Sequence, residues 1–289
     1  MLPLSPPAAD RADAPAAPDL PRRQWLAGAL GLGATAAGLG GCATGPAEPA
    51  ADADPEPAAG PMPAPQVVPF SGAALGVPPP GWRPYALRKD LIRTRYSVVQ
   101  DGERRVLNAR AAASATGLRC AVHIDPAQRS QLHFSWRVRA VPPQSDIAQA
   151  VHDDCPARLV LAFDGDHTRL SLRERLLFDQ VELFTGQRLP YATLMYAWDG
   201  GSHAVDSVHR NHRTARIQYL TVESGAQRAG RWLHYQRDVV ADYQRVYGEA
   251  PGTLIGVGVL TDADALKLQL EAWYGDITLL PRPAVATTG

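Results

Sequence analysis

The chain has 289 residues with 29 basic and 29 acidic side chains, so its formal net charge is zero. A general polyanion binder needs a basic surface that releases counterions, and this balance argues against nucleic acid as a partner. After Pro80 the chain carries 26 basic and 22 acidic side chains, an excess that an ordinary solvated surface accommodates. The length allows one large domain or two small ones.

The N-terminal residues have the features of an export signal. Arg22 and Arg23 precede a charge-free apolar run at 25–41, which small residues close before Cys42. A basic start, a short apolar run and small residues at the cleavage point are typical of a secretory signal. The run is too short and too rich in glycine to favour a membrane-spanning helix. We therefore predict that residues 1–42 are a signal peptide.

Two resemblances refine this signal. The sequence Leu-Gly-Gly-Cys resembles a bacterial lipobox, which implies that Cys42 becomes the lipidated first residue of the mature protein. The Arg22-Arg23 pair and the residues after it resemble a twin-arginine signal. Residue 43 is alanine rather than the aspartate associated with inner-membrane retention. We expect a periplasmic protein held at a membrane, the outer one, through a lipid on Cys42.

The next segment has the composition of a spacer. Residues 43–80 are dominated by Ala, Pro, Asp and Glu, and 17 of the 26 prolines lie at or before Pro80. Such a segment buries too little apolar surface to offset its ordering entropy, and proline keeps it extended. We expect 43–80 to be a disordered linker, 81–281 the folded domain and 282–289 a disordered tail.

Alternating polar and apolar residues predict strands throughout the expected domain. Along 132–141 one face holds Leu, Phe, Trp and Val and the other holds His, Ser and Arg, which is typical of an antiparallel sheet. The Asp101-Gly102 pair predicts a hairpin turn between strands at 92–98 and 105–110. Further strands are expected at 118–124, 157–163, 191–198, 213–222, 253–260 and 271–280.

Two segments have the apolar spacing and end signals of helices. Ser171–Thr185 begins at a capping serine and ends before Gly186, and Arg237–Tyr247 ends before Gly248. Because helices do not alternate regularly with strands, the pattern argues against a doubly wound α/β fold. We predict a mainly β protein, an antiparallel β-sandwich of the jelly-roll or carbohydrate-binding-module type with one or two short helices.

Cys120 and Cys155 would both lie in an oxidising compartment. They could form a disulfide that closes a loop of about 35 residues and adds roughly 3–4 kcal/mol. Two buried free thiols are the equally weighted alternative. A catalytic cysteine is disfavoured because no partner histidine is evident in the sequence.

His203, His209 and His212 lie in one polar loop, in which Asp206 is the only carboxylate. Histidines three apart could ligate a metal on a helical turn, but this spacing matches no defined site. We interpret the segment as a solvated loop and assign no metal to it.

The stretch from Asp164 to Asp166 begins like a calcium-binding loop. Arg169 and Arg175 occupy the positions where an EF-hand requires glycine and glutamate, so an EF-hand is excluded. A less regular calcium site formed by Asp164, Asp166 and a carbonyl remains an alternative, and no cofactor is assigned.

Two pairs of aspartates are the candidate ligand-binding or metal-binding residues. Asp262 and Asp264 would face the same way on an extended chain, and Asp153 and Asp154 precede a strand. Like charges this close share a cation such as calcium, share a proton or point into water. Paired carboxylates are also what a glycosidase requires, but their separation decides that chemistry. The structural alternative is that Asp153 and Asp154 cap turn amides or pair with Arg158.

Five motifs resemble one bacterial family. They are HDDCPARLVLAF, the Tyr196-Ala-Trp198 strand, RDVVADYQRVYG, IGVGVLTDAD and AWYGDI. In this order, and over residues 82–280, they resemble domain-of-unknown-function family 3047. The family is uncharacterised, so the resemblance implies no activity. The Tyr-Gly-Asp-Ile stretch at 274–277 also resembles the last strand of carbohydrate-binding β-sandwich modules.

Three functions fit these observations. We favour a non-enzymatic envelope lipoprotein whose sandwich binds a saccharide or another envelope component. The alternatives are a glycan hydrolase that uses the paired aspartates, and a structural partner in an envelope complex with Arg237 and Asp238 as an internal salt bridge. Trp198, Trp232, Tyr235 and Trp273 could stack on sugar rings if they are exposed, and the alternative for each is that it packs in the core.

Overall fold

The computed structural model describes residues 64–86, 92–186 and 188–282. The expected signal peptide, with Arg22, Arg23 and Cys42, and the first part of the expected spacer lie outside the described residues. Residues 283–289 of the expected tail also lie outside them. Among the described residues, no helix has the length and apolar character needed to span a membrane.

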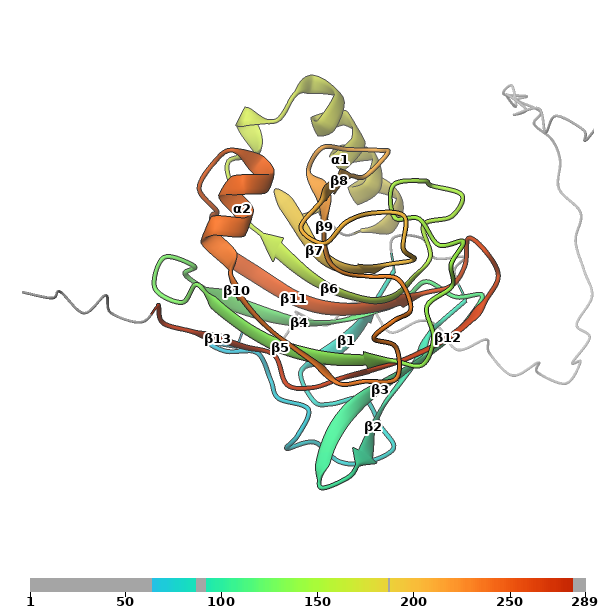
Figure 1. The fold of residues 1–289 in the computed structure, drawn as a ribbon. Coiled ribbons are helices and arrows are strands. Elements are labelled where there is room, and N and C mark those ends of the chain that lie inside the picture. The colour runs from blue at the N-terminus through green and yellow to red at the C-terminus, as the bar shows by residue number, and fades with distance from the viewer. Residues whose placement is uncertain (1–63, 87–91, 187, 283–289) are drawn as a thin grey trace, which may run out of the picture. The chain divides into compact units, whose positions relative to one another are not determined.

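The strands form two sheets that pack face to face (Figure 1). One has seven strands in the order β1-β4-β11-β6-β7-β9-β8, and the other has the order β10-β5-β12-β3-β2 with β13 paired to β5. All pairs are antiparallel except β7 with β9. The strands are β1 (Trp82–Tyr85), β2 (Arg95–Asp101), β3 (Arg104–Ala112), β4 (Gly117–Ile124), β5 (Gln131–Val138), β6 (Cys155–Phe163), β7 (Ala192–Asp199), β8 (Val208–Arg210), β9 (Ile217–Ser224), β10 (Leu233–Asp238), β11 (Leu254–Asp262), β12 (Gln269–Tyr274) and β13 (Thr278–Leu280).

The core lies between the two sheets. Leu132, Phe134 and Trp136 alternate along β5 and point inward, as the period of two requires. Strands β6 and β7 are buried along almost their whole length, which explains why their sequences are continuously apolar rather than alternating. The prediction of a mainly β, antiparallel sandwich is confirmed.

Two helices lie on the side of the seven-stranded sheet in Figure 1. Helix α1 (Leu172–Thr185) begins with a capping box between Ser171 and Glu174, after a short 3₁₀ turn, η1 (His167–Arg169). Helix α2 (Val239–Tyr247) is capped by Asp238, so it begins two residues later than the sequence pattern predicts. Both end at glycines, Gly186 and Gly248, whose φ angles of 70° and 72° favour a residue without a side chain.

Residues 64–80 belong to the folded part, which corrects the expected boundary at residue 81. Phe70 is fully buried in the core and packs against Trp82 with ring centroids 4.8 Å apart. The amide N–H groups of Phe70 and Ser71 donate to the carboxylate of Asp276, at 2.6 and 3.0 Å. The spacer prediction failed here because a few apolar residues among the prolines fill the core without forming a periodic element.

Candidate functional site

The two aspartate pairs lie together at one end of the seven-stranded sheet. Asp153 and Asp154 directly precede β6, Asp262 ends β11, and the antiparallel register places Asp262 opposite Cys155. Carboxylate oxygens of Asp154, Asp262 and Asp264 lie within 4.8 Å of one another. Sheet pairing therefore brings together residues that are about a hundred positions apart in the sequence.

Arg158 on β6 joins the two pairs. Its Nη1 donates to Asp262 Oδ2 at 2.9 Å and its Nη2 donates to Asp153 Oδ1 at 2.5 Å. The arginine side chain is only 3% exposed. We call Asp153, Asp154, Arg158, Asp262 and Asp264 the Arg158 cluster.

Backbone amides and a phenol complete the contacts of the cluster. Asp154 is fully buried and accepts hydrogen bonds from the amides of Ala265 and Leu266, at 2.8 and 2.9 Å. The hydroxyl of Tyr219 donates to Asp153 at 3.2 Å and itself accepts from Asn211 at 2.9 Å. Asp153 thus pairs with an arginine and Asp154 caps a turn.

The cluster holds more carboxylates than positive charges. Burial raises the pKa of Asp262 to about 8, because desolvation outweighs the attraction of Arg158. Burial also raises the pKa values of Asp153 and Asp154. Asp262 therefore keeps its proton at neutral pH, and Asp154, Asp262 and Asp264 are the residues that could share a cation instead.

The Arg158 cluster is largely covered by the rest of the protein. The side chains of Asp153 and Asp262 are 18% and 10% exposed. Two surface depressions, of about 410 and about 200 Å³, are lined by residues around Asp125 and Ser130 and by no member of the cluster. A glycosidase needs its carboxylates at a cleft that admits a sugar chain, so this geometry favours a structural role for most of the contacts.

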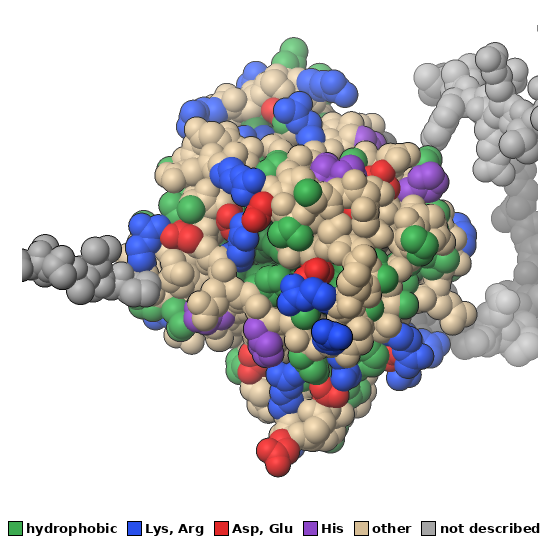
Figure 2. Space-filling view, in the orientation of Figure 1, with side chains coloured by type: hydrophobic (Ala, Val, Ile, Leu, Met, Phe, Trp, Pro, Cys, Tyr) green, Lys and Arg blue, Asp and Glu red, His purple; other side chains and the backbone are tan. Residues whose placement is uncertain are grey.

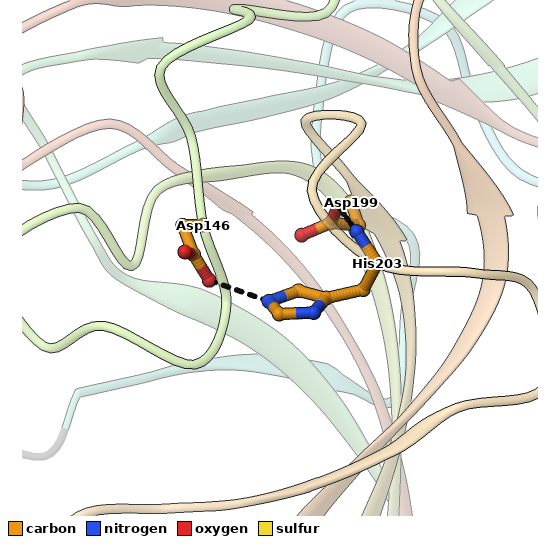
Figure 3. Close-up of side chains that lie close together, drawn as sticks. All are labelled: Asp146, Asp199 and His203. Atoms are coloured by element: carbon orange, nitrogen blue, oxygen red, sulfur yellow. Dashed lines mark hydrogen bonds and ion pairs between the residues drawn. The ribbon is translucent and has the colours of Figure 1, made fainter.

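A second group of titratable side chains was missed by the sequence reasoning. His203 Nε2 lies 2.7 Å from Asp146 Oδ1, and Asp199 lies beside them (Figure 3). Asp199 accepts hydrogen bonds from the amides of Gly201 and His203, at 2.9 and 3.0 Å. These contacts join the loop after β5 to the loop after β7. The spacing of the histidines in the sequence suggested His209 and His212 as partners of His203. It could not show that Asp146, in a distant loop, lies next to His203.

The other two loop histidines have different environments. The ring of His209 packs on that of His203 with centroids 4.0 Å apart, and its Nε2 lies 2.8 Å from Ser207 Oγ. Burial lowers the pKa of His209, and His203 adds to this effect. Asp206 pairs with Arg237 at 3.0 Å rather than with a histidine.

Asp164 and Asp166 serve the turn after β6. Asp164 accepts from the amide of Gly165 at 2.9 Å, and Asp166 accepts from the amide and the hydroxyl of Thr168, at 2.9 and 2.6 Å. The carboxylate oxygens of Asp164 and Asp166 thus accept hydrogen bonds from neighbouring residues of the same turn.

Of the two equally weighted alternatives for Cys120 and Cys155, the structure has two buried free thiols rather than a disulfide. Cys120 on β4 lies opposite Val257 of β11, and Cys155 on β6 lies opposite Asp262 of the same strand. The two cysteines are therefore separated by the width of β11, about 10 Å, and by five positions along it. A disulfide requires Cα atoms about 4.4–6.8 Å apart.

The predicted salt bridge between Arg237 and Asp238 is also corrected. Neighbouring residues on a strand point to opposite faces, so the two side chains diverge. Arg237 binds Asp242 through Nε and Nη2, at 2.8 and 2.7 Å, and Tyr196 donates to the same carboxylate at 2.8 Å. Asp238 caps α2 and pairs with Arg282.

The aromatic candidates divide by burial. Trp198 is fully buried and donates from Nε1 to the carbonyl of Gly225 at 2.9 Å, so it cannot stack on a ligand. Tyr235 packs on Phe134 with centroids 5.0 Å apart. Trp273 and Trp232 are only partly buried, and they remain as candidates.

Trp232 and Trp273 alternate with arginines on the outer face of the six-stranded sheet. The guanidinium of Arg104 lies 4.0 Å from the Trp232 ring, and that of Arg137 lies 4.3 Å from the Trp273 ring and 5.4 Å from the Trp232 ring. Asp101 accepts from Arg137 at 3.0 Å and from Trp232 Nε1 at 2.7 Å. We call these five residues the tryptophan–arginine strip. In Figure 2 basic (blue) and acidic (red) side chains lie next to one another over the lower strands, and further basic side chains lie over the upper part of the molecule.

A second polar group borders the strip on the same face. Glu271 on β12 pairs with Arg110 at 2.8 Å and with Arg139 at 2.7 Å. Asn108 donates to Glu271 at 3.2 Å and lies opposite Trp273 in the sheet register. The alternation of polar and apolar residues could have indicated that Arg137 and Trp273 lie on a polar sheet face. It could not have indicated the contact between Arg137 and Trp232.

The sheet order and the burial pattern define a β-sandwich domain. Residues 80–278 match the model of the family described as "Protein of unknown function (DUF3047)", and the chain belongs to this family. No curated protein matches the chain.

Several solved structures match most of this chain at low similarity. An arabinose-bound GH51 α-L-arabinofuranosidase matches with 10% identity and a TM-score of 0.36 over 74% of this chain, which spans 25% of that enzyme. The family 30 carbohydrate-binding module of a Clostridium thermocellum cellulase matches with 11% identity and a TM-score of 0.32, over 77% of this chain and 96% of the module. A family 28 module specific for non-crystalline cellulose matches with 10% identity and a TM-score of 0.28, over 69% and 83%. These values are too low to support an argument about function.

Proposed function

We propose that this protein is an exported lipoprotein whose β-sandwich is a non-catalytic saccharide-binding module. Its binding surface is the tryptophan–arginine strip. The observation that carries the proposal is the pair of partly exposed rings, Trp232 and Trp273, set among charged side chains on one sheet face. Aromatic rings offer an apolar face to a sugar, and carboxylates and guanidinium groups bind its hydroxyls.

The strip is held in place before any ligand arrives. The Trp232 ring is fixed by the hydrogen bond from Nε1 to Asp101 and by the guanidinium of Arg104 above it. Trp273 is fixed by its strand and by Arg137. Because these side chains are already ordered, little further entropy is lost when a ligand binds.

A glycan hydrolase is the second candidate. A specific observation favours it: burial raises the pKa of Asp262 to about 8, beside other carboxylates within 4.8 Å, so Asp262 holds the proton that a general acid needs. It ranks second because Arg158 and backbone amides already occupy Asp153, Asp154 and Asp262, and these side chains are largely covered.

The export and anchoring part of the proposal comes from the sequence. Arg22, Arg23 and the apolar run before Cys42 are the expected signal, and the lipid on Cys42 would hold the domain at the membrane. Replacement of Cys42 by alanine should move the protein from the membrane fraction to the soluble periplasmic fraction. Retention of the Cys42→Ala variant in the membrane fraction would count against the anchor.

Saccharide binding is tested with a glycan array. The mature chain should bind at least one glycan class, and Trp273→Ala should weaken that binding at least about tenfold, since stacking is lost. The matched control is Leu183→Ala, which removes an exposed apolar side chain on α1, away from the strip. A chain that binds no glycan, or a Trp273→Ala variant that binds like wild type, would contradict the proposal.

A further inference from the structure

We infer that the tryptophan–arginine strip selects acidic saccharides, chains whose sugar rings carry carboxylates. The sugar rings contact the partly exposed indoles of Trp273 and Trp232, and the carboxylates bind the guanidinium groups of Arg104 and Arg137. This inference rests on the proposed saccharide-binding function and names the class of ligand.

The first support is that the strip has hydrogen-bond donors to spare. Arg104 is exposed and its guanidinium contacts the Trp232 ring, but this guanidinium makes no hydrogen bond or ion pair with any described residue. Arg137 donates to Asp101 from Nη2 at 3.0 Å, and its Nη1 makes no hydrogen bond with any described residue. A guanidinium presents its N–H groups as a planar fork that fits a carboxylate in two parallel bonds.

The second support is the charge balance of this face. Asp101 is the only carboxylate of the strip, and Arg137 and the Trp232 indole occupy its two oxygens. Beside it, Glu271 is shared by two arginines, Arg110 and Arg139. The strip and the group around Glu271 together hold four guanidinium groups and two carboxylates, although the whole chain has no net charge. A neutral glycan gains nothing from this surplus, whereas an acidic one compensates it.

The third support is the order of the side chains. Arg104, Trp232, Arg137 and Trp273 follow one another as cation, ring, cation, ring, because each guanidinium lies over an indole. A polyuronate repeats the complementary order of sugar ring and carboxylate along its length. Stacking on the indole also holds each guanidinium in a fixed plane, which lowers the entropy lost in a bidentate contact.

The experiment is isothermal titration calorimetry of the mature chain with a matched pair of ligands. One ligand is an oligogalacturonate, and the other is the same oligomer methyl-esterified, which keeps the rings and removes the charges. We expect the free acid to bind at least about tenfold more tightly than the ester. The preference should shrink as sodium chloride is raised from about 50 to about 500 mM, because salt screens exposed charges.

Two variants assign the effect to the strip. Arg104→Gln should weaken binding of the free acid about fivefold or more and leave binding of the ester unchanged. The matched control is Arg173→Gln, an exposed arginine on α1 that should bind both ligands like wild type. Thermal unfolding of each variant checks that the fold is intact.

The possible outcomes separate this inference from the proposed function. Equal binding of acid and ester, or an Arg104→Gln variant without effect, would overturn the acidic specificity while saccharide binding stands. Absence of binding to these ligands and to a neutral oligosaccharide panel would overturn both. If a single-stranded oligonucleotide bound as tightly as the oligogalacturonate, the acidic-saccharide specificity would also be overturned, since the strip would then bind polyanions in general.

Discussion

Arg158 Nη1 lies 2.9 Å from Asp262 Oδ2, yet burial raises the pKa of Asp262 to about 8 despite this close positive charge. The reason is that one guanidinium serves several buried carboxylates, and the desolvation of each exceeds the attraction it receives. The carboxylates at this end of the sheet therefore bind protons more tightly in the folded than in the unfolded protein. This difference makes the free energy of unfolding depend on pH, which can be measured.

The first prediction concerns pH. The folded protein holds a proton on Asp262 up to about pH 8, whereas an unfolded aspartate loses it near pH 4. The free energy of unfolding should therefore fall as pH rises through this window, by about 2 kcal/mol between pH 6 and 8, and level off above it. Urea unfolding at a series of pH values measures the slope.

Asp262→Asn gives the corresponding test. The variant has no proton to lose at this position, so its stability should vary less with pH than that of wild type. Asp179→Asn, an exposed carboxylate on α1, is the control and should keep the wild-type slope. If Asp262→Asn showed the same decline as wild type, the proton would reside elsewhere.

The second prediction concerns Arg158→Met, which removes the guanidinium and keeps an unbranched side chain. Asp153 and Asp262 then lose their buried partner, and we expect a loss of about 3–5 kcal/mol in unfolding free energy. The loss should be larger near pH 8 than near pH 5, because protonation relieves the unpaired charges at low pH.

Chemical denaturation at both pH values measures this difference. Arg173→Met on α1 should change stability by less than about 0.5 kcal/mol. Equal stability of Arg158→Met and wild type at both pH values would show that the ion pairs contribute nothing net.

The third prediction tests whether residues 64–80 belong to the domain. Phe70 is fully buried against Trp82, so Phe70→Ala should lower the free energy of unfolding by about 3–5 kcal/mol. Leu75 lies in the same segment but is 51% exposed, and Leu75→Ala should cost less than about 0.5 kcal/mol. Similar values for the two variants would mean that the segment does not complete the core.

The fourth prediction concerns the thiols. Burial raises the pKa of Cys155 to about 11 and also raises that of Cys120, so both should resist alkylation in the native protein. Both should react completely in denaturant without a reducing agent. Mass spectrometry of the alkylated peptides measures this, and recovery of a peptide that links Cys120 to Cys155 would contradict the free thiols.

Much of the fold follows from local patterns in the sequence. The alternation along β5 and the Asp101-Gly102 turn predict strands, and Ser171 and Gly186 mark the ends of α1. These signals lie within a few residues of one another, so they can be read without knowing the partners. Strand β10 was missed because a short edge strand, with only Leu233 fully buried, has a weaker pattern.

The candidate sites followed from the sequence only in part. Sequence motifs singled out the paired aspartates, and tertiary structure showed that Arg158 joins them and that Asp262 is buried. Trp198 and Trp273 have similar neighbours in the sequence. Only the structure shows that Trp198 is fully buried, whereas Trp273 is partly exposed and remains a stacking candidate. Contacts between Arg104, Trp232 and Arg137 depend on a hairpin and a distant loop meeting on one sheet face.

By itself the sequence determined most strand and helix segments and the β-sandwich class, because periodicity, turn residues and caps act over a few neighbouring positions. The export signal stays a prediction from the sequence. Only the tertiary structure decided that the two cysteines lie on either side of β11, that Phe70 completes the core, and which charged side chains share a partner. These facts depend on strand register and burial, which are set by contacts between residues far apart in the chain.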